Sequence, residues 1–96
     1  MSYKIEFNPQ ASKELLKLDK SVRTFILDEL SEFEAKFSLE YEKELTKTGK
    51  IKHLKGEFLG LYRLRLRTYR IIYEKQNDRL VIYILRVAHR KEVYWF

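Results

Sequence analysis

The chain has 96 residues, of which 45% are hydrophobic, 15% aromatic and 35% charged, and its formal net charge is +6. This length fits a single domain, residues 1–96, and the apolar content argues against disorder. The absence of cysteine excludes disulfides and thiolate metal sites. No signal peptide or membrane-spanning stretch is recognisable, so we expect a cytoplasmic protein that does not act at a membrane.

The positive charge is concentrated in the second half of the chain. Residues 1–48 contain eight basic and ten acidic residues, whereas residues 49–96 contain twelve basic and four acidic ones. A clustered basic surface gains affinity for polyanions because binding releases their counterions. The asymmetry therefore predicts a polyanionic partner, and membrane headgroups or an acidic protein segment would meet the same field.

The first half of the sequence predicts a strand followed by two helices. Tyr3–Phe7 alternate apolar and polar residues, which is typical of a strand with one buried face. Asn8 and Pro9 favour a helix start, and the apolar spacing extends this helix to about Asp19. A second helix is predicted from a cap at Ser21. Its apolar stripe consists of Val22, Phe25, Ile26, Leu30, Phe33 and Phe37.

The second half predicts a sheet. Residues 38–49 are expected to form a frayed helix end and a loop, and from Ile51 the apolar period changes to two. Strands are predicted over residues 61–67, 69–75 and 79–87, with a hairpin turn at 76–78, and residues 51–55 are expected to form a short strand or a loop edge. We therefore predict an α+β fold, β-α-α-β-β-β, in which an N-terminal strand and an antiparallel helical hairpin pack on a small, mostly antiparallel sheet.

The strand at 61–67 carries three arginines on one face. Leucine and tyrosine alternate there with Arg63, Arg65 and Arg67, and a hairpin brings Arg70 to the same side. Further basic residues at the end of the last strand are His89, Arg90 and Lys91. One row of alternating arginines is often only a solvated face, and Arg67 and Lys91 fit that interpretation. Because like charges at neighbouring sites repel, the convergence of the others indicates an anion-binding face.

The residues of the basic half are compatible with a metal-independent ribonuclease. Motifs of metallohydrolases, P-loop proteins and serine or cysteine hydrolases are absent from the sequence. RNA supplies its own nucleophile, the 2′-OH, so the protein must align it, neutralise the phosphate and move two protons. Arginine neutralises phosphate but hardly deprotonates, so His89 or Tyr94 would have to move the protons. The terminal aromatics Tyr94, Trp95 and Phe96 could stack on bases or simply hold the tail on the core.

Four segments of the sequence together resemble the RelE/ParE toxin superfamily, and more particularly its RelE branch. These segments are Lys52–Gly56, Tyr62–Arg65, Tyr69–Tyr73 and His89–Tyr94. The resemblance implies a toxin of a type II toxin–antitoxin system that cleaves mRNA in the ribosomal A site and inhibits translation. It also implies a cognate antitoxin as partner, ribosome and mRNA as target, and no metal or small-molecule cofactor.

The same resemblance implies roles for individual residues. Arg63 and Arg65 match positions that contact the scissile phosphate region, and Arg70 and Arg90 match arginines that stabilise charge in the transition state. Tyr94 matches the tyrosine that stacks on the substrate nucleotide and helps activate the 2′-OH. Additional RNA-binding candidates are Lys52, Lys55, Arg67 and Lys91.

Two departures from the family pattern are visible. Relatives often carry lysine at the positions of Arg63 and Arg65, and because arginine does not usefully lose its proton, His89 becomes a candidate general base. We also expect no C-terminal helix. Two other functions stay open: a ParE-like, non-enzymatic toxin that poisons DNA gyrase, and an inactive relative that binds only antitoxin and operator DNA.

Overall fold

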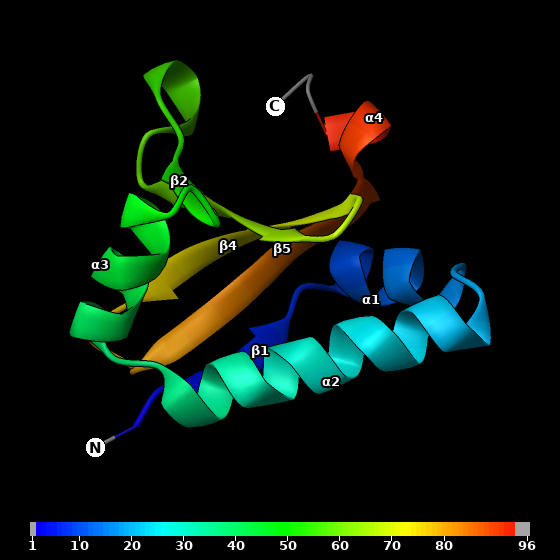
Figure 1. Ribbon diagram of the computed structural model, residues 1–96, viewed down its shortest axis with the longest axis horizontal. Helices are drawn as coiled ribbons and strands as arrows, with labels where there is room; N and C mark the ends of the chain where they lie inside the picture. Colours follow the sequence, from blue (N-terminus) through cyan, green and yellow to red (C-terminus); the bar gives the residue numbers. More distant parts are fainter. Residues whose placement is uncertain (1, 94–96) are drawn as a thin grey trace.

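The computed structural model describes residues 2–93, and they form five strands and four α-helices (Figure 1). In chain order the elements are β1 (Lys4–Phe7), α1 (Pro9–Leu16), α2 (Lys20–Lys36), α3 (Leu39–Lys47), β2 (Ile51–His53), the 3₁₀ turn η1 (Gly56–Phe58), β3 (Leu61–Leu66), β4 (Tyr69–Gln76), β5 (Val81–His89) and α4 (Arg90–Val93).

The five strands form one mixed sheet in the order β1-β5-β4-β3-β2. β2, β3, β4 and β5 pair antiparallel in succession, and β1 joins the outer edge of β5 in parallel, with Lys4 opposite Val81. The sheet is therefore mostly antiparallel and is covered by helices, which confirms the predicted α+β class.

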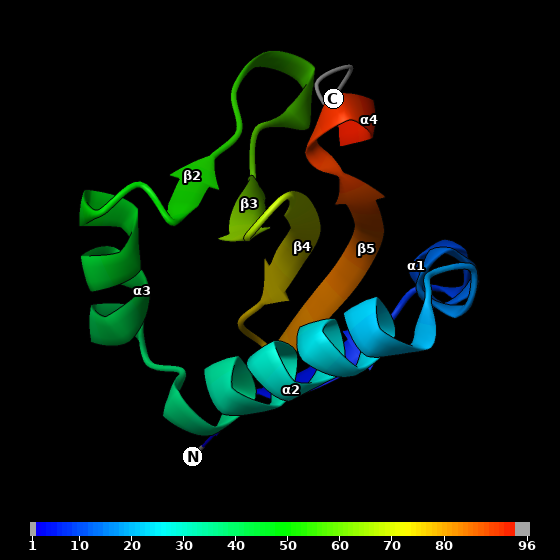
Figure 2. The same ribbon diagram turned by 45° about the vertical axis from the view of Figure 1, so that its right-hand side comes forward.

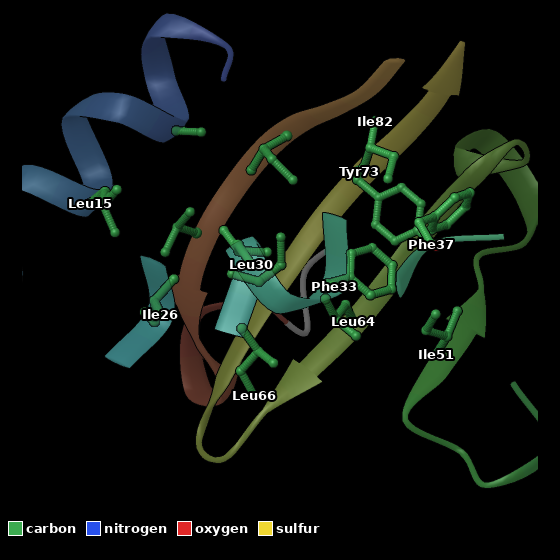
Figure 3. Close-up of a cluster of buried hydrophobic side chains, with 14 residues drawn as sticks. Leu15, Ile26, Leu30, Phe33, Phe37, Ile51, Leu64, Leu66, Tyr73 and Ile82 are labelled. Carbon is green, nitrogen blue, oxygen red and sulfur yellow. The ribbon is translucent and has the colours of Figure 1, made fainter. Parts of the chain in front are cut away.

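Helices α1, α2 and α3 cover one face of the sheet and enclose the main core. Figure 2 shows α2 crossing this face, with α1 beside β5 and α3 beside β2. The core joins Ile26, Leu30 and Phe33 of α2 to alternate residues of the strands, such as Leu64 and Tyr73 (Figure 3). These side chains are at most 4% exposed. None of the helices within residues 2–93 has the length and apolar character required to cross a bilayer.

The other face of the sheet carries η1 and α4, which rise on the side away from α2 (Figure 1). A second and smaller apolar cluster lies on this face. It is formed by Ile72 and Ala88, which are buried, together with the half-buried Leu54, Leu61 and Leu85. This side of the sheet, which α1, α2 and α3 leave uncovered, is called the open face below.

Two carboxylates satisfy backbone amides along the β1 side of the sheet. Glu34 of α2 accepts a hydrogen bond from the outward N–H of Ile5 at 2.7 Å. β1 pairs with residues 81–84 of β5 and leaves the edge of β5 after residue 84 unpaired. There Glu14 of α1 accepts a hydrogen bond from the N–H of Val87 at 2.8 Å, and it also forms an ion pair with Arg86 at 2.6 Å. Because exposed strand edges promote association with other chains, these carboxylates protect the edge.

The expectation of a frayed helix end and loop over residues 38–49 was wrong, because α3 is a complete helix. Ser38 caps it by accepting a hydrogen bond from the N–H of Tyr41 at 3.0 Å. Its single fully buried residue is a carboxylate, Glu42, instead of an apolar side chain. The side of this helix that faces the sheet therefore combines the apolar Tyr41 and Leu45 with a buried charge, which the sequence alone did not indicate.

Several helix and strand boundaries in the structure also differ from the predicted ones. The first helix ends at Leu16, and the second begins at Lys20 after Asp19, so Ser21 lies inside the helix and is not its cap. The last strand runs two residues later than predicted, because Leu80 adopts a left-handed φ of 55° in the preceding turn. A single helical turn, α4, follows this strand, contrary to the expected absence of a C-terminal helix.

Candidate nucleic-acid interface

The open face presents basic side chains in two adjacent rows across strands β2, β3 and β4. Leu64 and Leu66 point into the core and are 1% and 3% exposed, so the alternate residues Arg63 and Arg65 point to the open face. In one row Arg65 lies directly opposite Arg70 of β4. In the next row Arg63 lies opposite Lys52 of β2.

The charges of these residues repel one another. Partial burial lowers the pKa of Arg70, and the neighbouring charges of Arg63, Arg65 and Arg90 lower it further. The arginine cluster is defined as Arg63, Arg65, Arg70 and Arg90. No salt bridge within residues 2–93 involves a member of the cluster. A concentration of cations without acidic partners destabilises the free protein and favours binding of an anion.

Carbonyl groups at the β3–β4 turn hold two members of the cluster, Arg70 and Arg90, by hydrogen bonds. Nη1 of Arg70 donates to the carbonyl oxygens of Arg67 and Tyr69 at 2.8 and 3.0 Å. The N–H of Arg90 donates to the carbonyl of Thr68 at 2.7 Å. One short turn therefore holds the side chain of Arg70 and the main chain of Arg90.

The floor of the open face is apolar. Ile72 lies opposite Arg63, and Ala88 lies opposite Arg70. Both are buried within the smaller apolar cluster. Guanidinium groups beside an apolar floor can bind a phosphate and, next to it, the flat surface of a sugar or base.

His89 lies on the other side of the sheet from the arginine cluster. It pairs with Tyr69, in the row of residues that faces the helices, and its ring meets the Tyr69 ring edge-on at 5.5 Å. Its Nδ1 accepts a hydrogen bond from the N–H of Lys91 at 3.2 Å. The ring also lines a cavity of about 340 Å³ beside Glu14 of α1 and Lys17, the residue that follows this helix. The structure thus separates His89 from the arginines with which the sequence grouped it.

The remaining predicted residues are dispersed. Arg67 occupies the β3–β4 turn, where its guanidinium carbon lies 4.0 Å from the ring centre of Phe25 in α2. Lys55 precedes η1 and Lys91 belongs to α4, and both are exposed. Tyr94 lies outside the described residues.

Sequence reasoning missed a buried polar network that supports β4 from the core side. Glu42 of α3 is 4% exposed and accepts hydrogen bonds from the Tyr73 hydroxyl at 2.6 Å and from Nζ of Lys75 at 2.5 Å. Burial raises the pKa of Tyr73, and its hydrogen bond to Glu42 adds to this effect. For Lys75, burial opposes the charged form, but the bond to Glu42 outweighs it and the pKa is raised. The tyrosine therefore stays protonated and the lysine charged.

These features determine which chemistry the open face can support. Arginines can neutralise a phosphate and stabilise additional negative charge on it, but they cannot accept a proton usefully. Within residues 2–93 no three potential metal-ligating side chains lie together. The arrangement therefore fits binding of a polyanion and electrostatic stabilisation of a reacting phosphate.

Comparison with known proteins gave a family match and similar structures. The family described as "ParE toxin of type II toxin-antitoxin system, parDE" matches residues 5–94. The chain is similar to Toxin RelG of Mycobacterium tuberculosis, with 29% identity over 95 residues that cover 98% of each protein.

The fold is similar to that of solved RelE structures. One is the archaeal RelE–RelB complex from Pyrococcus horikoshii, with a TM-score of 0.68, 27% identity and coverage of 97% of this chain and 100% of the other. Another is the isolated RelE toxin of E. coli, with a TM-score of 0.67, 26% identity and coverage of 98% and 93%.

Proposed function

Because the chain belongs to the ParE/RelE family of toxins from type II toxin–antitoxin systems, we propose that it is a metal-independent endoribonuclease that cleaves mRNA in the ribosomal A site and so inhibits translation. The observation that carries this proposal is the arginine cluster, whose members face the open side of the sheet without an acidic partner among residues 2–93. We treat residues 1–96 as one RelE-like toxin domain that acts in the cytoplasm.

In the proposed reaction the ribose 2′-OH attacks the adjacent phosphorus. The O2′–P bond forms, the P–O5′ bond breaks, and the products are a 2′,3′-cyclic phosphate and a 5′-OH. Arg63 and Arg65 bind the scissile phosphate, with Lys52 extending the contact along the RNA backbone. Arg70 and Arg90 stabilise the charge that develops in the transition state.

The reaction also requires that one proton leave the 2′-OH and that one reach O5′. The arginines hold their protons, so a different group must accept the first one. Tyr94 is the proposed residue for stacking on the nucleotide and activating the 2′-OH. His89 ranks second for this role, since its ring lies on the α1 side of the sheet.

A cognate antitoxin is the proposed protein partner. The similar archaeal RelE was crystallised with RelB, which supports a comparable pairing for this chain. An exposed cationic surface favours an acidic, amphipathic segment, which would cover the arginine cluster and silence the toxin.

The proposal is tested by inducing three proteins in a bacterial host and mapping mRNA 5′ ends by primer extension. These are the wild type, Arg90→Ala and Arg79→Ala. Arg79 is the matched control, because it is an exposed arginine paired with Glu6 at 3.2 Å, outside the cluster. We expect new cuts in translated regions with the wild type and Arg79→Ala, and none with Arg90→Ala. A reporter mRNA lacking its start codon should stay intact.

Two results would change the assignment. Full cleavage by Arg90→Ala would remove this residue from the site. Growth arrest with intact mRNA and gyrase-dependent DNA breaks would instead favour a gyrase poison, a function compatible with the ParE description of the matching family.

A further inference from the structure

We propose that Arg67 is a positioning residue, which holds the β3–β4 turn against α2 and thereby fixes the guanidinium of Arg70 and the main chain of Arg90. In this view Arg67 does not contact the RNA. The inference rests on the proposed ribonuclease function, and it assigns a purpose to an arginine that the sequence could interpret only as solvated or RNA-binding.

The backbone at Arg67 is unusual. Its φ is 56°, and Leu80 is the only other non-glycine with a positive φ among residues 2–93. This left-handed conformation is unfavourable for a residue with a β-carbon, so local interactions must compensate for it. In this conformation the carbonyl of Arg67 accepts from Nη1 of Arg70 at 2.8 Å, and the carbonyl of Tyr69 accepts from the same nitrogen.

The side chain of Arg67 attaches the turn to a rigid element. Its guanidinium carbon lies 4.0 Å from the ring centre of Phe25, which is within the range of a cation–π contact. Phe25 belongs to the 17-residue helix α2 and packs against the main core. The contact with Phe25 therefore anchors the turn to the core, and the guanidinium of Arg67 points towards α2.

The hydrogen bonds that hold Arg70 matter because the positive charges of the arginine cluster repel one another. Arg63, Arg65 and Arg90 all disfavour the charge on Arg70, so an untethered guanidinium would move away from them into solvent. The two carbonyl acceptors oppose that movement. Since the carbonyl of Thr68 also accepts from the N–H of Arg90, the same turn sets the spacing between Arg70 of β4 and Arg90 of α4.

Three variants separate positioning from direct contact. Arg67→Gly removes the side chain and tolerates the positive φ, Phe25→Leu removes the aromatic ring but keeps an apolar side chain, and Arg67→Lys keeps the cation. Single-turnover cleavage of ribosome-bound mRNA gives the rate, and binding of the same complex with a 2′-O-methyl codon gives the affinity. Arg79→Ala serves again as the control for loss of one positive charge.

We expect Arg67→Gly and Phe25→Leu each to slow cleavage by about tenfold to a hundredfold, the range observed when reacting groups are displaced. Substrate affinity should hardly change, Arg67→Lys should retain most of the rate, and the double variant should be no slower than the slower single variant, since both act through one contact. If Phe25→Leu cleaves normally while Arg67→Gly binds weakly, Arg67 contacts RNA directly and the inference is overturned. Normal rates for both variants would also overturn it.

A second measurement needs no RNA and therefore tests the inference separately from the proposed function. The NMR order parameter of the Arg70 Nε–Hε bond should be high in the wild type and lower in Arg67→Gly and Phe25→Leu. This result in a wild type that fails to cleave mRNA would support the positioning role while rejecting the ribonuclease proposal. Equal order in all three proteins would reject the positioning role, whatever the cleavage activity.

Discussion

Removal of one buried hydroxyl tests how α3 is held on the sheet. In Tyr73→Phe the carboxylate of Glu42 loses the hydrogen bond that it accepts at 2.6 Å, and it keeps only the bond from Lys75. Tyr73 is fully buried and Glu42 is 4% exposed, so the donor is lost from a site that is largely closed to solvent. The ring itself remains, and with it the stacking on Tyr62 at 5.1 Å.

The expected loss follows from the charge of the acceptor. A hydrogen bond to a charged group contributes about 1.5–3 kcal/mol to stability, so we expect a loss of about 2 kcal/mol in the free energy of unfolding. For a chain of this length that corresponds to a decrease in Tm of about 8–16 °C.

Chemical denaturation followed by circular dichroism measures this loss. Tyr83→Phe is the matched control, because Tyr83 is half-buried on β5 and its hydroxyl makes no hydrogen bond within residues 2–93. The control should unfold like the wild type. A Tyr73→Phe protein as stable as the wild type would refute the argument that this hydroxyl holds Glu42 in place.

Two further predictions concern pH and the sheet edge. The pKa values of Lys75 and Tyr73 are raised in the folded protein, so above pH about 10 the unfolded chain loses protons that the folded protein retains, and stability should fall as the pH rises. Titration of the denaturation midpoint should show this fall, and Tyr73→Phe should reduce its slope; a midpoint that is constant from pH 9 to 11 would contradict it. Glu14→Ala should lower stability by about 2 kcal/mol in urea unfolding, because Arg86 and a β5 amide lose a charged acceptor that they share. Glu6→Ala, which breaks only an exposed ion pair, should cost at most about 1 kcal/mol, and equal losses in the two variants would argue against the edge interpretation.

The strands of the sheet were predictable because each places apolar residues on a buried face. Strict alternation in β3 identified Arg63 and Arg65 as neighbours on one face, and the register with β4 confirms that Arg70 joins them. Helix α3 escaped prediction because its inward face uses the charged Glu42, which becomes favourable only when Tyr73 and Lys75 approach it from a strand more than thirty residues away.

The position of His89 could not be read from the sequence for a different reason. The register between β4 and β5 shifts between Ile72 and Tyr73. The side of the sheet to which each β5 residue points therefore cannot be assigned by counting from the hairpin turn alone. Residues on the far side of such a shift exchange faces relative to simple alternation. The contact of Arg67 with Phe25 was equally hidden, since it joins a turn to a helix that the sequence places more than forty residues earlier.

The parallel pairing of β1 with β5 has a consequence for how the sheet assembles. Residues Lys4 and Val81 lie side by side in the sheet, and β5 sits between β1 and β4. β1 can therefore pair only when β5 is available, and completion of the sheet depends on a contact of long sequence separation. Until β5 has formed, the chain has neither a complete sheet nor the hydrogen bond from the N–H of Arg90 to the carbonyl of Thr68 that holds Arg90 beside the other arginines of the cluster.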